Sequence, residues 1–450
     1  MVLIKILSIF LLLPSLFVLN KLVKKKDLNF FDLLIVFNTL YFVIIPLKSN
    51  KSVFDSIGRI TESTSILVFF YLLFFFISLL IASRFVGMEV NSPINLTYYI
   101  KNYPKLKGSL FFKVFLIVLP IFSIIYYVPQ ISMISAFDEI QDASSNISYE
   151  QSSLIKFFAT IFKIGLVVVI TMFIQNIKEK KYDILIIISL LLFLINLLLL
   201  SRRELLLFFL FGAIIFYSYN RDLINRKLML FAVVLGVFLY FIYFPFYNII
   251  RFSPVEFNIK NPTSSIAAIY DYGIDSFGDA KESASERTDS RALGLYRAIY
   301  WLTEYDTDSD ITWGGITLSA IDHAIPKVIN PKKGLGSELI LQDRMHTAYD
   351  SADSVLLLAL ADYSMLGAVF TALIYFLVYK IMFFISRSSE FFFGKTIISL
   401  YLVFFLFSLA FDTEQKLDGM LANMVAYILV IVLIVLVHRL NFIRMAQIEE

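Results

Sequence analysis

The chain has 450 residues, of which 59% are hydrophobic, and its mean hydropathy is +0.78. Its 47 Phe and 25 Tyr are more than the core of a soluble protein of this length could hide, so an ordinary soluble domain is excluded. The sequence contains no cysteine, which excludes disulfides, thiolate nucleophiles and thiolate metal sites.

About eleven apolar stretches follow one another along the chain, most of them near the roughly 20 residues that cross about 30 Å of hydrocarbon. They lie near residues 2–20, 28–47, 64–83, 112–130, 157–176, 183–200, 205–219, 228–247, 354–379, 393–411 and 419–437. The first stretch resembles a signal peptide, but it has no small-residue cleavage site and leads directly into further spans, so we expect it to be retained. The polar sequence Ser201-Arg202-Arg203-Glu204 predicts a tight turn between two helices.

One long polar interval, residues 248–351, interrupts the apolar stretches. It separates an N-terminal part, residues 1–247 with about eight predicted spans, from a C-terminal part, residues 352–450 with about three. The predicted fold class is therefore an all-α polytopic membrane protein with one large, partly helical extracytoplasmic loop.

The orientation of the chain follows from the cations in its short loops. Alternate loops are rich in Lys and Arg, for example residues 21–26, 101–113 and 178–181, whereas the opposite set includes the acidic segment 138–150. Because cation-rich loops stay in the cytoplasm, we expect the N-terminus and the large loop to lie outside and the C-terminus inside. The net charge of +3 reflects this topology and gives no indication of nucleic-acid binding.

The large loop offers little for a metal or a nucleotide. Its two histidines, His323 and His346, lie 23 residues apart without a zinc-binding pattern. The acidic run 305–310 begins like a calcium loop, but Ile311 occupies the place where the sharp turn requires glycine. No glycine-rich phosphate loop follows a strand-like segment. The sequence predicts neither a metal nor a cofactor.

Ionisable residues inside membrane spans are costly and often functional. The predicted spans contain Lys5, Lys163 and Asp362. At 1.5 Å per residue, Lys163 and Asp362 are expected roughly 9–12 Å below the outer surface. Asp362 could serve as an internal partner for Lys163 or Arg203.

Three arginines are predicted just above that depth. Arg202 and Arg203 lie in the tight outer turn, and Arg251 follows the eighth span. A single cation near the end of a span can extend to the headgroups. Several cations at one level, on the side of the large loop, favour an anion site, and a lipid pyrophosphate suits it because guanidinium groups pair with phosphate oxygens in a bidentate way.

Two classes of membrane protein compete at this point. A transporter needs polar groups at mid-membrane, often in broken helices. The spans here consist mainly of Leu, Ile and Phe, contain few Pro and Gly, and show no inverted repeat. An enzyme acting on a lipid-linked substrate needs cations at the leaflet surface and a folded outer loop. The second description fits better.

Several polar segments carry distinctive residue patterns. Residues 290–298 read SRALGLYRA and precede Trp313-Gly314-Gly315. They resemble a loop of the O-antigen ligase and polymerase superfamily in which an Arg opens a short helix and a Gly-rich turn follows. Residues 324–333 read AIPKVINPKK, which is similar to a stretch of Wzy-type repeat-unit polymerases. Residues 361–367 read ADYSMLG, with an acid, an aromatic residue and a final Gly as in the family, and the Ser201-Arg202 pair resembles one at an outer helix junction.

The chain departs from the ligase-type pattern at one position. Where ligases have a histidine, this chain has Asp353, and His346 lies seven residues upstream. The departure favours a polymerase over a ligase.

The resemblance implies an inner-membrane glycosyltransferase that polymerises undecaprenyl-pyrophosphate-linked repeat units into O-antigen or capsular polysaccharide outside the cytoplasmic membrane. Such an enzyme would work beside a flippase and a chain-length regulator. The expected pyrophosphate-binding residues are Arg202, Arg203, Arg251 and Arg291. The expected general base is Asp353, followed by His346 and His323. The alternatives are an O-antigen ligase and an exporter of polysaccharide or lipid-linked sugar.

Overall fold

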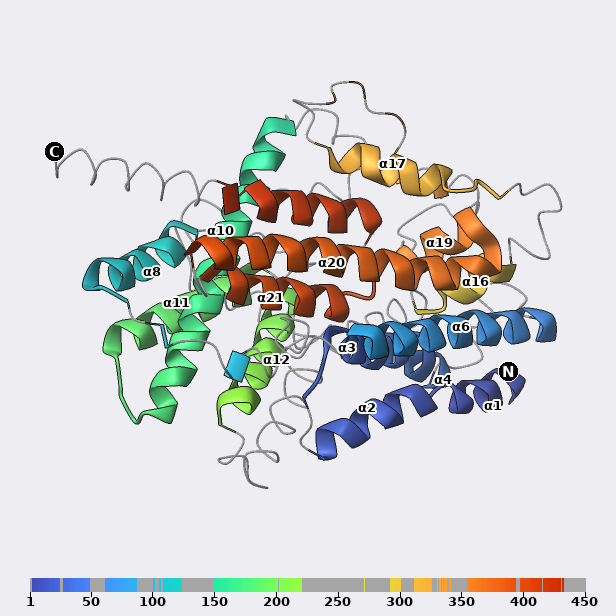
Figure 1. Cartoon of the computed structure of the whole chain (residues 1–450), viewed down its shortest axis with the longest axis horizontal. Helices are drawn as coiled ribbons and strands as arrows, with labels where there is room; N and C mark the ends of the chain where they lie inside the picture. Colours follow the sequence, from blue (N-terminus) through green and yellow to red (C-terminus); the bar gives the residue numbers. More distant parts are fainter. Residues whose placement is uncertain are drawn as a thin grey trace.

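The computed structural model describes the chain in segments, nearly all of them helical, and contains no strand within them (Figure 1). The described residues are 2–24, 27–48, 61–86, 100–101, 105–106, 108–123, 149–200, 202–220, 271, 292–300, 311–325, 330, 332, 334, 336–337, 340–341, 354–393, 397–414, 416–429 and 431–432. The helical character of the predicted fold class is confirmed for these residues.

The predicted first span is divided into two short helices, α1 (Val2–Phe10) and α2 (Leu13–Val23). Pro14 stands in the first turn of α2. Proline has no N–H, and its ring clashes with the carbonyl four residues earlier, which favours a helix break before this position. The apolar run near residues 2–20 is therefore formed by two helices that are separated at residues 11–12.

The second span is continuous but contains a wider turn. It consists of α3 (Phe30–Thr39), the π-helical η1 (Leu40–Ile44) and α4 (Ile45–Lys48). The Ile45 N–H donates to the carbonyl of Leu40, five residues earlier. Pro46 follows at once, and a π-turn is a common way to relieve the clash that a proline causes inside a helix.

The remaining helices confirm the predicted division of residues 183–219, because α11 ends at Leu200 and α12 begins at Arg202. The others are α6 (Glu62–Val86), α8 (Leu110–Phe122), α10 (Tyr149–Lys178), α11 (Ile184–Leu200), α12 (Arg202–Tyr219), α16 (Gly294–Tyr300), α17 (Gly315–Ala324), α19 (Val355–Tyr363), the 3-10 turn η7 (Ser364–Leu366), α20 (Gly367–Phe393), α21 (Ile397–Phe411) and a last helix over Leu417–Leu429.

Four helical stretches in the described part of the chain are long and apolar enough to cross a membrane: Phe30–Lys48, Glu62–Val86, Thr160–Lys178 and Val355–Ile385. Five shorter apolar helices accompany them, at Leu110–Phe122, Ile184–Leu197, Glu204–Tyr219, Leu400–Phe411 and Leu417–Leu429. These helices suggest a membrane protein. The predicted span over 228–247 and most of the predicted loop over 248–351 lie outside the described residues.

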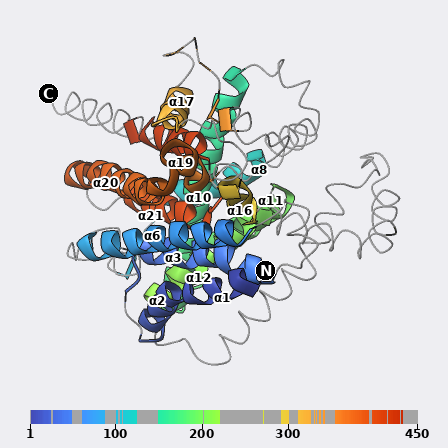
Figure 2. The same ribbon diagram turned by 90° about the vertical axis from the view of Figure 1, so that its right-hand side faces the viewer.

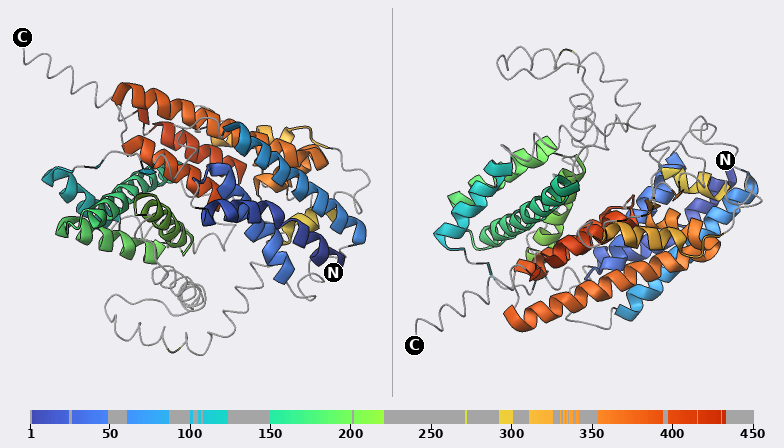
Figure 3. Two further views of the ribbon diagram at one scale, coloured as in Figure 1. Left: turned by 60° about the horizontal axis from the view of Figure 1, so that its bottom comes forward. Right: turned by 90° about the horizontal axis from the view of Figure 1, so that it is seen from above.

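The helices pack in two groups (Figures 2 and 3). The first group contains α8, α10, α11 and α12. In it, α8 and α11 run in the same direction, since Ser189 donates to the carbonyl of Leu116 and Asn196 donates to that of Pro120. The second group contains α3, α6, α20 and α21. Phe211 of α12 joins the two groups, because its ring lies 4.9 Å from Phe404 of α21.

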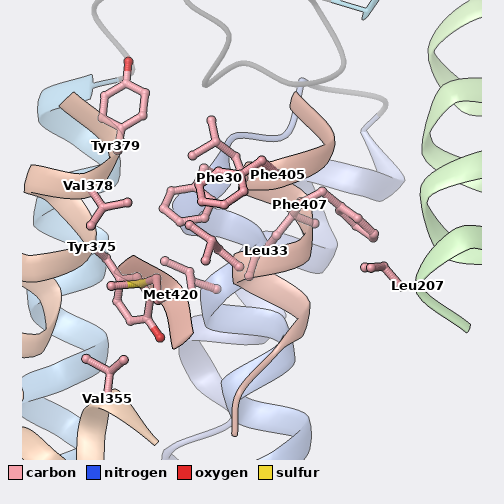
Figure 4. Close-up of a cluster of buried hydrophobic side chains, with 14 of the residues drawn as sticks. Phe30, Leu33, Leu207, Val355, Tyr375, Val378, Tyr379, Phe405, Phe407 and Met420 are labelled. Atoms are coloured by element: carbon pink, nitrogen blue, oxygen red, sulfur yellow. The ribbon is translucent and has the colours of Figure 1, made fainter. Parts of the chain in front are cut away.

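Aromatic rings fill the core of the second group (Figure 4). Phe30 of α3 packs edge-on against Tyr375 of α20, with ring centroids 6.4 Å apart. Phe37 contacts Phe407 of α21 in the same manner at 6.0 Å. Edge-to-face pairs contribute about 0.5–1.5 kcal/mol each beyond the burial of their area. The abundance of Phe in the sequence therefore serves helix–helix packing as well as contact with lipid.

A polar tether joins residues 105–113, before and at the start of α8, to residues 175–183, at the end of α10 and just after it. The Leu106 N–H donates to Gln175 at 3.0 Å. Lys105 pairs with Glu179, and Lys113 pairs with Asp183 at 2.6 Å. The hydrogen bonds from Lys105 and Lys181 lower the pKa of Glu179, and the hydrogen bond from Lys113 lowers the pKa of Asp183. These pairs lie on the side that the sequence predicts to be cytoplasmic.

The predicted ninth span is not one straight helix. A Cβ added to Gly367 would lie 2.1 Å from the carbonyl oxygen of Ala359, whereas residues eight apart in a continuous helix are separated by about 12 Å. The chain therefore reverses through η7, where Ser364 has a φ of 51°. α19 is buried along almost its whole length and, at about 14 Å, is too short to cross a membrane.

Candidate functional site

The predicted cation site begins at the junction of α11 and α12. Arg202 and Arg203 occupy the first turn of α12, an 18-residue helix. The first N–H groups of a helix have no partner within it and carry the positive end of the helix dipole. Both features favour an anion at this end of α12.

Lys163, which the sequence predicts at a similar depth, is not a free cation. Its ammonium lies 2.7 Å from the Glu204 carboxylate, joining α10 to the first turn of α12. The side chains of both residues are about one-third exposed. The pair holds Lys163 in a contact between two helices, at the depth that the sequence predicts for it. It also engages the acidic residue closest in sequence to Arg202 and Arg203.

Asp362 has a different role from the one expected. Its fully buried carboxylate accepts hydrogen bonds from the Ile316 N–H at 3.0 Å, from the Thr317 N–H at 2.7 Å and from the hydroxyl groups of Thr317 and Thr312. These donors lie at the beginning of α17, so Asp362 is a carboxylate cap contributed by another helix. The suggestion that it pairs with Lys163 is wrong, because Lys163 binds Glu204.

The sequence Trp313-Gly314-Gly315 shapes the entry to α17. The Trp313 N–H donates to the backbone carbonyl of Asp362 at 3.0 Å. Gly314 has a φ of +96°, and a Cβ there would lie 2.8 Å from the Tyr363 hydroxyl. Only glycine meets both conditions without strain. The Gly pair is recognisable in the sequence, but no sequence pattern connects it to Asp362, some 50 residues away.

His323 is the one predicted base that the described residues include. It lies in the last turn of α17, beside Asp322. The Asp322 carboxylate accepts from the side-chain amide of Asn330 and from the Gly334 N–H at 3.3 Å. Gly336 passes the imidazole, since a Cβ there would lie 3.7 Å from Nε2 of His323. The chain after α17 thus folds back onto the end of the helix that carries His323.

Four predicted site residues, Arg251, Arg291, His346 and Asp353, lie outside the described residues. The residue after Asp353 is Ser354, whose side chain caps α19 by accepting a hydrogen bond from the Leu357 N–H at 3.2 Å.

The two described parts of the candidate site lie apart. In Figures 1 and 2, α17 lies above the α20–α21 pair and α12 lies below it. The helix that carries His323 and the helix that begins at Arg202 thus lie on different sides of this pair. Within the described segments, no group of three or more His, Asp or Glu residues is arranged to hold a metal ion.

No protein-family model matches this chain, and no curated protein or solved structure matches it either.

Proposed function

We propose that this chain is a membrane glycosyltransferase that polymerises polyprenyl-pyrophosphate-linked oligosaccharide repeat units at the outer face of the cytoplasmic membrane. The leaving group of this reaction is already a pyrophosphate. The protein mainly has to bind that group, balance its charge and position an acceptor hydroxyl.

The observation that carries the proposal is the Arg202–Arg203 pair in the first turn of α12, next to a Glu204 that is engaged by Lys163. Arginine side chains and the free N–H groups of a helix N-terminus are both suited to bind a phosphate. The order of the sequence segments that resemble repeat-unit polymerases supports the same reading. Arg251 and Arg291 complete the proposed pyrophosphate site, and Asp353 is the proposed base, ahead of His346 and His323.

A second candidate function, export of a polysaccharide or a lipid-linked sugar, is favoured by one observation. The reversal between α19 and α20 leaves a short buried helix next to a long one. Transporters often use interrupted helices of this kind to form a substrate path. An O-antigen ligase is the alternative within the enzyme class.

Deletion of the gene distinguishes the three functions by what accumulates. Loss of a polymerase leaves a single repeat unit on the surface glycolipid, because flipping and ligation continue. Loss of a ligase leaves a bare acceptor and full-length polymer on the lipid carrier, whereas loss of an exporter traps the units on the cytoplasmic face. Either of the last two outcomes would overturn the proposal.

A further inference from the structure

The outward surface of α17 is apolar. Trp313, Leu318 and Ile321 are 74%, 65% and 45% exposed. On the opposite side of the helix, Ile316 and Ala320 are fully buried. None of the charged or hydroxyl-bearing residues of this helix is among its exposed positions, and the Asp322 carboxylate is bonded to the chain that follows the helix. A helix that faces water presents polar side chains outward, and α17 does the reverse.

α20, which follows α19 through the reversal at η7, also has an exposed apolar face. On α20 and the turn before it, the exposed side chains recur every three to four residues, so they share one face of the helix. They are Leu366, Val369, Leu373, Leu377, Ile381 and Phe384. This face belongs to a stretch long and apolar enough to cross a membrane.

Aromatic contacts connect the two surfaces. Gly314, at the start of α17, lies against the Tyr363 hydroxyl, and the Tyr363 ring stacks on Phe370 of α20 with centroids 4.2 Å apart. α17 itself packs against α19, the helix that ends at Tyr363. Trp313 stands at the N-terminal end of α17, and Trp is enriched where a membrane meets water.

The backbone at the start of α17 meets the condition for contact with lipid. Its first four N–H groups, those of residues 315–318, all have acceptors within the protein. Two donate to the Asp362 carboxylate, and the other two donate to the carbonyl oxygens of Thr312 and Gly314 at 3.0 and 2.8 Å. Unpaired backbone groups cost several kcal/mol each in hydrocarbon, so a helix end is tolerated there only when such partners are present.

We infer that α17 lies in the membrane, with Trp313, Leu318 and Ile321 against lipid acyl chains. Part of the region between the eighth and ninth predicted spans is then a membrane-embedded helix locked to α19 by Asp362, and the aqueous loop is shorter than the sequence indicates. The inference is independent of the chemistry that the protein performs, because it depends only on the exposed surface and on the capped backbone of α17.

Spin labelling tests the inference in the full chain, which has no native cysteine. Leu318→Cys and Ile321→Cys carry a nitroxide in phosphatidylcholine–phosphatidylglycerol nanodiscs. Leu373→Cys on α20 is the lipid-facing reference, and Lys180→Cys, in the exposed turn after α10, is the water-facing reference. We expect both α17 labels to collide more often with oxygen than with a water-soluble nickel chelate, as at residue 373. Preference for the chelate, as at residue 180, or protection from both reagents, as under a protein partner, would overturn it.

Tryptophan fluorescence provides a second readout without a label on α17. The chain has two Trp residues, so Trp301→Phe leaves Trp313 as the sole emitter. We expect lipids brominated in their acyl chains to quench Trp313 more strongly than aqueous iodide does. Stronger quenching by iodide would contradict the membrane position of this end of α17.

Discussion

Asp362 accepts two hydrogen bonds from Thr317, one from its backbone N–H at 2.7 Å and one from its hydroxyl at 2.5 Å. The two residues are 45 positions apart, on α19 and α17. A carboxylate at this place opposes the positive end of the α17 dipole and satisfies its first donors. The contact links the region after the eighth predicted span to the interrupted ninth span.

Replacement of Asp362 is expected to release α17. Asp362→Ala leaves buried donors without an acceptor, which costs on the order of 3 kcal/mol. Asp362→Asn keeps the shape of the side chain but turns an NH₂ group toward N–H and O–H donors, so it should also destabilise the folded protein. Thermal unfolding in detergent and proteolysis within residues 311–325 measure the effect. Asp418→Asn is the matched control, because within the described residues the Asp418 carboxylate accepts from the adjacent Gly419 N–H. Equal stability of the Asp362 and Asp418 variants would show that the cap is dispensable.

Gly367→Ala should prevent the reversal between α19 and α20. The new methyl group would meet the backbone of Ala359 at 2.1 Å, where no flexible side chain can move aside. We expect a loss of about 3 kcal/mol or more, at the upper end for overpacking. Gly419→Ala is the control, because a Cβ there meets nothing within 4 Å, and alanine in a helix should stabilise by about 0.5–1 kcal/mol. A tolerated Gly367→Ala would contradict the close approach of the two helices.

We expect substitutions of the arginines in the proposed pyrophosphate site to affect polymer length, unlike substitution of Lys163. Arg202→Ala, Arg203→Ala and Arg291→Ala should each abolish long polymer while the protein still reaches the membrane. Arg→Lys should rescue poorly, since a point charge replaces a two-pronged donor. Polymer length on gels is the measurement, and wild-type length in all three alanine variants would leave only a structural role for these cations.

Lys163→Met provides the comparison for those variants. Since Lys163 pairs with Glu204 at a partly exposed site, its loss should cost only about 0.5–1 kcal/mol of stability and should be offset in a Lys163→Met, Glu204→Gln double variant. Polymer length should therefore stay at the wild-type value in Lys163→Met and in the double variant. Loss of long polymer in both variants would place Lys163 in the substrate site.

The proposed base is tested at Asp353. Asp353→Asn should reproduce the deletion phenotype if the carboxylate accepts the proton of the acceptor hydroxyl, because an amide cannot act as a base at neutral pH. His346→Ala and His323→Ala should polymerise in that case. Normal polymer from Asp353→Asn together with failure of one histidine variant would move the base to that histidine.

The polar tether between residues 105–113 and residues 175–183 should weaken in acid. The pKa values of Glu179 and Asp183 are lowered from their ordinary values of 4.5 and 3.8 by their lysine partners. A lowered pKa in the folded state contributes stability above the ordinary value and loses it as the pH falls through the lowered one. We therefore expect hydrogen exchange at residues 105–106 to be pH-independent above about pH 5 and to accelerate below about pH 4, after correction for the intrinsic rate. Lys113→Gln should reduce this acid dependence, and Lys332→Gln, at an exposed position, should not.

The sequence by itself determined the helical character of the described residues. Long apolar runs predict spans because each turn of a helix satisfies its own backbone, so the division at Ser201 could be read from local residues. It also pointed to Arg202 and Arg203 at that junction.

Only the tertiary structure decided the partners of the buried charges and the course of the ninth span. Residues 354–379 read as one apolar run, because a reversal needs a close backbone approach at Gly367, and hydropathy does not register it. Lys163 and Asp362 were both expected at the same depth, yet they bind Glu204 and the start of α17. A side chain selects its partner by distance in space, and that distance is fixed by the packing of helices that are far apart in the sequence.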